Sequence, residues 1–231
     1  MLIPLTQEKL EELIPRIATA DQYHYYWGKA SDFLRRMLIS VVAGVCVFIL
    51  RLFVWEAIHP ITFILGIIAG FYWLWSPVYL ASRRNTEIRR YSYGGFWRGR
   101  VLDVFITDEV IGAEETVNKR GDLVIVENRE RRLTLEVGDK TGFNTQLQVP
   151  LRRDHRLIRR GDLAEMLVLS NRPDLSRINM VSDIYIPDHK LWISDYPYVQ
   201  KTSFMEVSRK LMRQQQRKRR PYRSSDPVWE N

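Results

Sequence analysis

The stretch MLISVVAGVCVFILRLFVWEAIHPITFILGIIAGFYWLWSPVYLA, residues 37–81, decides the fold of this chain. It contains two apolar segments, expected as helices over Met37–Ile58 and Ile61–Ala81, with His59-Pro60 between them. Each segment is close to the ~20 residues that a helix needs to cross a bilayer. The sequence therefore predicts a transmembrane hairpin of two helices, which carries the polar remainder of the chain.

Four residues of this hairpin are predicted to bind a partner: Arg51, Glu56, Gly66 and Gly70. A charge inside a bilayer is costly, so Arg51 either extends to the far headgroups or, with Glu56, pairs with a partner subunit. Gly66 and Gly70 form a G-x-x-x-G pattern, which permits close approach between helices. We expect this approach around Gly44 of the first helix and against a partner.

The charges that flank the hairpin predict its orientation. Arg35-Arg36 precede the first segment, and Arg83-Arg84 and Arg89-Arg90 follow the second. Positive residues concentrate on the cytoplasmic side of membrane proteins. Both termini are therefore expected on the cytoplasmic side or on its topological equivalent.

The chain divides into four parts around this feature. Residues 1–36 are expected to form an amphipathic helix, which packs on the protein's own soluble part, lies on the membrane or docks a partner. The aromatic segment Asp21–Trp27 follows it and is typical of a membrane interface. Residues 37–82 hold the hairpin, residues 92–200 a soluble domain, and residues 201–231 a basic helix and tail.

The soluble domain is expected to be mostly β. From Tyr93 onward the apolar residues alternate, which is typical of strands. Many short strands with polar turns predict a small antiparallel barrel of the SH3-like or OB-like type, with helices flanking it on the N- and C-terminal sides. A turn is expected at 118–121, and 162–170 is compatible with a strand or a short helix. The other expected strands lie at 96–106, 123–126, 133–137, 145–149, 178–186 and 191–196.

Most of the net charge of +8 lies in a basic cluster in the C-terminal segment, and residues 152–160 hold a second basic cluster. Such clusters favour anionic lipid, an acidic protein surface or nucleic acid. Anionic lipid or an acidic protein is the favoured partner, because the domain is tethered to a membrane and has no aromatic RNA-stacking motif. The predicted surface-binding residues are Arg152, Arg153, Arg156, Arg159, Arg160, Arg217, Lys218, Arg219 and Arg220.

The sequence offers little that would support catalysis. Cys46 is the single cysteine, which excludes a disulfide framework and a cysteine-based zinc site. Glu56 and His59 have the spacing of a di-iron half-site, but such sites need a second copy of the motif and further glutamates. No phosphate-binding glycine loop, dinucleotide fingerprint or zinc-protease motif occurs. We therefore predict no enzyme activity and no catalytic, cofactor or metal residues.

The opening MLIPLTQEKLEELIPRIATADQYHYYWGKASDFLRR, the hairpin and the junction WSPVYLASRRN resemble a family of two-span membrane proteins of cyanobacteria with plastid relatives. Its members are sometimes labelled phosphate transporter permeases, a label that two spans without repeats do not support. The resemblance implies a thylakoid location, with the soluble domain on the stroma-like side. It assigns no functional residue.

These observations lead to one favoured function and two alternatives. The favoured function is a non-enzymatic accessory or assembly factor of an integral membrane complex, expected to be photosynthetic and photosystem-like. The first alternative is a membrane-tethered module that binds RNA or ribosomes. The second is a small transporter or channel subunit, which needs several copies to build a pore.

Overall fold

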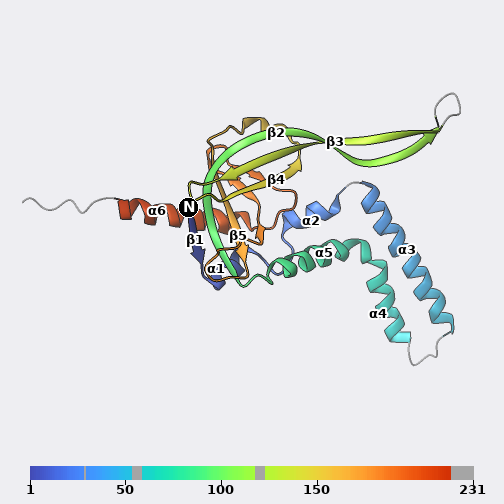
Figure 1. Cartoon of the computed structure of the whole chain (residues 1–231). Coiled ribbons are helices and arrows are strands. Elements are labelled where there is room, and N and C mark those ends of the chain that lie inside the picture. The colour runs from blue at the N-terminus through green and yellow to red at the C-terminus, as the bar shows by residue number, and fades with distance from the viewer. Residues whose placement is uncertain (29, 54–58, 118–122, 220–231) are drawn as a thin grey trace, which may run out of the picture.

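The computed structural model describes residues 1–28, 30–53, 59–117 and 123–219. It consists of a sheet domain from which a helical limb and a long β-ribbon project (Figure 1). The first half of the chain contains β1 (Leu2–Leu5), α1 (Gln7–Leu13), α2 (Ala20–Trp27), α3 (Ala30–Phe53), α4 (His59–Gly70) and α5 (Tyr72–Ile88). The second half contains β2 (Tyr93–Val117), β3 (Leu123–Gly138), β4 (Asn144–Pro150), η2 (Arg153–Leu157), β5 (Leu163–Ser170), β6 (Met180–Val181), β7 (Ile184–Ile186), η3 (Pro187–His189), β8 (Leu191–Ile193) and α6 (Lys201–Arg219).

The soluble domain is an open antiparallel sheet, so the predicted SH3-like or OB-like barrel is wrong. The eight strands follow the order β4-β3-β2-β5-β7-β8, with β1 added to β2 and β6 added to β5. This order leaves β4 and β8 at opposite edges. The mostly-β character, the helix over residues 201–219 and the strand at 163–170 agree with the prediction.

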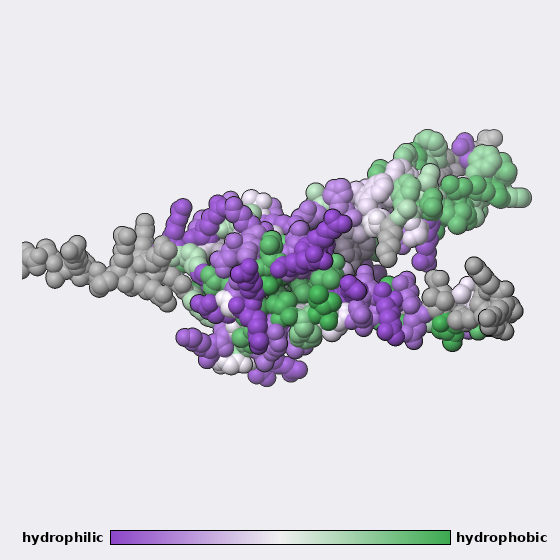
Figure 2. Space-filling view, turned by 90° about the horizontal axis from the view of Figure 1, so that it is seen from above, coloured by the Kyte–Doolittle hydropathy of each residue, from purple (hydrophilic) through white to green (hydrophobic). Residues whose placement is uncertain are grey.

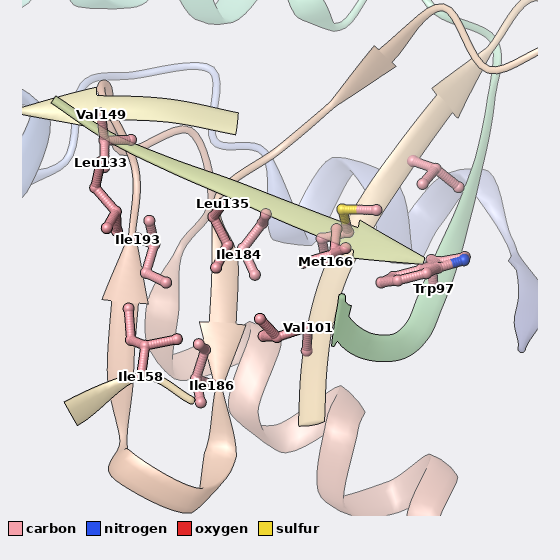
Figure 3. Packing of buried hydrophobic residues seen from close by; sticks show 13 residues of the cluster. Trp97, Val101, Leu133, Leu135, Val149, Ile158, Met166, Ile184, Ile186 and Ile193 are labelled. Carbon is pink, nitrogen blue, oxygen red and sulfur yellow. The ribbon is translucent and has the colours of Figure 1, made fainter. Parts of the chain in front are cut away.

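The sheet stays open because its central strands are buried on both faces. One cluster contains Trp97, Met166 and Ile184, which come from three neighbouring strands and converge in Figure 3. The alternate residues Phe96 and Leu167 point to the opposite face, where α1 and α6 cover them. Two covered faces explain why β5 contains the unbroken apolar run Met166–Leu169 rather than an alternating pattern.

The N-terminal helix belongs to this packing. Leu10, Leu13 and Ile14 are buried in the second cluster together with Phe204 of α6. Of the three alternatives for the amphipathic helix, packing on the protein's own domain is therefore the one that the structure shows. The helix ends at Leu13, two residues before Pro15.

Strands β2 and β3 continue beyond the sheet as a two-stranded ribbon. The expected strands 123–126 and 133–137 are one strand, because cross-strand ion pairs hold the polar residues between them in register. Arg132 lies 3.0 Å from Glu109, and Arg131 lies 3.8 Å from Asp108. The turn expected at 118–121 lies outside the described residues.

The helical limb has one continuous helix and one broken helix. The 24-residue α3 is long and apolar enough to cross a membrane. The second segment, expected as one helix over Ile61–Ala81, is instead α4 and α5, bent by 74° at Phe71. At the bend the Ser40 hydroxyl of α3 accepts a hydrogen bond of 2.9 Å from the Trp73 amide. The limb therefore offers one helix of spanning length, or two if the bent pair counts as one span.

The close packing around Gly99 gives a test of this fold. A Cβ added to Gly99 would overlap the buried Trp97 ring and the Gly138 carbonyl oxygen of the neighbouring strand. Gly99→Ala is therefore expected to lower the free energy of unfolding by ~1–3 kcal/mol, as overpacking does in a dense core. Urea denaturation of the full chain in detergent measures the loss.

The matched control is Gly112→Ala, on the ribbon of the same strand, where an added Cβ meets nothing within 4 Å. This variant is expected to leave the free energy of unfolding almost unchanged. Equal effects at both positions would contradict the packing described around Gly99.

Candidate functional site

Three of the four predicted partner-binding residues lie together on one groove of the helical limb. Arg51, Gly66 and Gly70 contribute to an open groove of about 360 Å³ between α3 and α4. Glu56 lies outside the described residues. The full lining is Gly44, Val47, Phe48, Arg51, Thr62, Phe63, Gly66, Ile67, Gly70 and Phe71.

The glycines give the groove its width. A Cβ on Gly66 would lie 3.7 Å from Val47, so α4 approaches α3 at Val47 rather than at the predicted Gly44. Gly44 and Gly70 face open space, with nothing within 4 Å of an added Cβ. The small residues therefore leave a concave apolar strip that a helix or a lipid chain can enter.

Arg51 supplies the charge of this groove. It lies in the last turn of α3, where the carbonyl end of the helix dipole favours a cation. Its side chain is exposed, and within the described part of the chain no acidic group lies within ion-pair distance of it. A guanidinium at the end of an apolar groove can pair with a carboxylate of a partner or with a phosphate.

The limb is joined to the sheet domain by a buried amide pair. Gln22 of α2 and Asn85 of α5 are 1% and 0% exposed and exchange two hydrogen bonds of 2.9 and 2.8 Å. The Gln22 amide nitrogen also donates to the Pro197 carbonyl at 2.8 Å. Because each buried polar group finds a partner, this pair fixes one relative position of α2, α5 and the loop that follows β8.

A second contact at this junction involves Arg84 of α5. Its guanidinium donates to the Tyr198 hydroxyl at 2.8 and 3.0 Å and lies 4.2 Å from the centre of the Tyr196 ring. Tyr25 of α2 packs edge-on against Tyr196, with ring centres 5.0 Å apart. Asp183 holds the same loop, because its carboxylate accepts hydrogen bonds of 3.1 Å from the amides of Tyr198 and Val199.

The predicted basic cluster of residues 152–160 lies at the other end of the sheet. All five arginines are exposed around η2, which buried His155 and Ile158 anchor to the domain. Burial lowers the pKa of His155, and the nearby Arg152 lowers it further. Arg160 lies 3.5 Å from Asp103. Asp103 is ten residues along β2 from Tyr93, where the strand begins after α5.

The C-terminal basic residues form no described surface. Arg217, Lys218 and Arg219 belong to the last turn of α6, and Arg220 lies outside the described residues. Among the residues whose positions are described, no three His, Cys, Asp or Glu side chains group as a metal site would require.

The fold and the groove define a class of protein with an apolar helical limb and an open antiparallel sheet beside it. The chain belongs to a family of unknown function (DUF8619), whose profile matches residues 3–218. No curated protein and no solved structure matches it.

The junction was missed in the sequence, although two signals point to it. Thr19-x-x-Gln22 has the spacing of a capping box, and both of its hydrogen bonds form, at 3.3 and 3.1 Å. Asn85 falls between Ala81 and Ile88 on the buried side of α5, so it interrupts an apolar face. A polar residue at such a position indicates a buried hydrogen-bonded partner.

Proposed function

We propose that the chain is a membrane-anchored accessory or assembly factor that docks to an integral membrane protein complex and acts without catalysis. The observation that carries this proposal is the groove between α3 and α4, with Arg51 at its end and glycines along its floor. An apolar groove with open glycine positions fits a transmembrane helix of a partner, because small residues allow helices to approach closely.

The surface of the limb supports insertion into a membrane. Leu38, Leu52 and Phe53 are 64%, 69% and 83% exposed, and Figure 2 shows hydrophobic surface gathered over the limb. Apolar surface of this extent needs lipid or protein to cover it. The sheet domain presents a mixed surface, as expected of a part that stays in water.

The junction gives the docking proposal a second element. Because Gln22, Asn85 and Arg84 fix the limb to the sheet domain, a partner helix seated in the groove would also fix the position of the sheet beside the partner. The sheet and its ribbon would then cover the partner's surface outside the membrane. Photosynthetic complexes of thylakoids are the first partners to examine, with both termini on the cytoplasmic or stromal side, because of the resemblance to cyanobacterial and plastid proteins.

Filling the groove tests the proposal. Gly70→Leu adds a side chain to the groove at a position where an added Cβ meets nothing within 4 Å. The expected result is at least a tenfold drop in the amount of partner complex that co-purifies in mild detergent, equivalent to ~1.4 kcal/mol.

The matched control is Val41→Phe, which adds bulk at a 58% exposed position of α3 outside the groove. It is expected to retain the complex. A chain that purifies alone at native abundance, or a complex that survives Gly70→Leu as well as Val41→Phe, would refute docking through this groove.

A further inference from the structure

The outer face of α5 carries an exposed stripe that changes from apolar to basic along the helix. Phe71, at the N-cap, and Trp75 and Tyr79 are 52%, 38% and 57% exposed. They recur every four residues along one side of the helix, and the exposed Arg83 and Glu87 continue the same row. The opposite face holds the buried Pro77, Ala81, Asn85 and Ile88, so the stripe is the side that the protein leaves uncovered.

This stripe faces the side toward which α4 projects. The Trp75 indole nitrogen on α5 donates a hydrogen bond of 2.9 Å to the Ile68 carbonyl of α4. The side chain of Trp75 therefore lies in the angle between the two helices. In Figure 1, α2 lies along α5 away from α4, so α5 separates α2 from the part of the limb that would enter a membrane.

The bend between α4 and α5 keeps α5 from following the direction of the limb into a bilayer. The 74° bend turns α5 away from the direction of α4. A helix that turns in this way, with Trp75 and Tyr79 on its open face, has the composition of an interfacial helix.

A hollow with basic side chains around it lies at the C-terminal end of the stripe. Arg16, Thr86 and Arg90 line a hollow of about 460 Å³ between α1 and the end of α5. Within the described ranges, Arg16 and Arg90 make no side-chain hydrogen bond or ion pair. Arg89 beside them is held by Glu11 at 2.7 Å. Two free guanidiniums around a hollow suit an anionic headgroup.

We propose that α5 lies in the headgroup layer of the membrane, with its stripe toward lipid and an anionic lipid headgroup in the hollow at its end. The apolar half would reach the hydrocarbon boundary, and Arg83, Arg16 and Arg90 would lie among the headgroups, with Glu87 paired to Arg83 at 3.6 Å. In this arrangement, the basic surface that contacts lipid is the hollow at the end of α5. The predicted cluster of Arg152–Arg160 lies some ten strand residues away, about 30 Å.

The proposal rests on the membrane insertion that the proposed function also requires, and the test separates the two. The full chain is reconstituted into phosphatidylcholine vesicles and carries an environment-sensitive fluorophore on one cysteine. The native Cys46, exposed on α3, reports insertion. In a Cys46→Ser background, Tyr79→Cys reports the stripe, and Leu157→Cys reports η2 in the basic cluster.

The expected result is that the label at 79 is quenched by lipids with a shallow spin label and is protected from aqueous iodide, whereas the label at 157 behaves in the opposite way. If the label at 46 is exposed to iodide, both proposals fail. If the label at 46 is buried while the label at 79 is as accessible to iodide as the label at 157, the docking proposal stands and the placement of α5 is wrong. Protection of the label at 79 from both quenchers would mean that protein covers the stripe, which also overturns this inference.

A second measurement tests the headgroup site. A label at Thr86→Cys is expected to shift its emission when phosphatidylglycerol is added to the vesicles, and the shift is expected to disappear in Arg16→Gln/Arg90→Gln. Inorganic phosphate should not reproduce the shift, because a free anion lacks the lipid's attachment to the surface. An equal shift with inorganic phosphate, or an unchanged shift in the arginine variant, would refute a lipid site in this hollow.

Discussion

Phe204→Ala is expected to lower the free energy of unfolding by ~3–5 kcal/mol, the usual cost of removing a fully buried aromatic side chain. Phe204 is 0% exposed and joins α6 to the sheet. Its ring centre lies 5.3 Å from that of Phe96 on β2 and 5.2 Å from that of Trp192 on β8. Alanine would leave a cavity among three strands and two helices, which these rigid elements cannot close.

Denaturation of the full chain in detergent, followed by circular dichroism, measures the loss. Leu157→Ala, at a 55% exposed position, is the control and is expected to change the free energy of unfolding by less than ~0.5 kcal/mol. Because Phe204 attaches α6 to the sheet, limited proteolysis is also expected to cleave α6 of the variant under conditions in which β8 stays folded. A loss below ~1 kcal/mol would show that α6 does not form part of the core.

The apolar limb could be predicted from the sequence because composition alone identifies it. The break at Phe71 could not, because it depends on tertiary contacts such as the hydrogen bond between Trp73 and Ser40. Pro77, the proline of this segment, lies inside α5 and does not end it, whereas α4 ends at Gly70. The groove was partly predictable: the glycines and Arg51 were identified, but not that Val47 would be the contact of Gly66.

The open sheet was harder to predict than the strands that form it. Strand β5 is apolar at alternate and intervening positions, which fits a strand covered on both faces but does not say what covers it. The covering helices α1 and α6 lie at opposite ends of the chain, and no local pattern links Leu13 with Phe204. The charged run that joins 123–126 to 133–137 was not predicted as strand, because its partners Asp108 and Glu109 are identified only once the register is known.

The stability of the chain is expected to fall as the pH rises from about 4 to about 7, because of Asp183. Its side chain is 2% exposed, and burial raises its pKa from 3.8 to about 7, against the opposing effect of the Tyr198 and Val199 amides and of Lys201. The folded chain then binds a proton that the unfolded chain has released between these two pH values. Stability is therefore highest below the unfolded pKa and is lost as the pH approaches the folded pKa, by an amount on the order of 4 kcal/mol.

Asp183→Asn separates this effect from other titrations. Asparagine cannot ionise, so the free energy of unfolding should lose this slope between pH 4 and 7. The Tyr198 and Val199 amides donate to different oxygens of the carboxylate, and the single oxygen of asparagine can accept from only one of them, so the pH dependence rather than the absolute stability is compared. Identical pH profiles for the two chains would contradict the assignment.

The same carboxylate connects stability to the junction between limb and sheet. Asp183 holds the loop that carries Tyr198 to Arg84 and the Pro197 carbonyl to Gln22. An ionised, desolvated Asp183 weakens that loop's attachment, so hydrogen exchange of the Tyr198 and Val199 amides should accelerate as the pH passes 7, beyond the intrinsic increase with hydroxide. In Asp183→Asn only the intrinsic increase should remain.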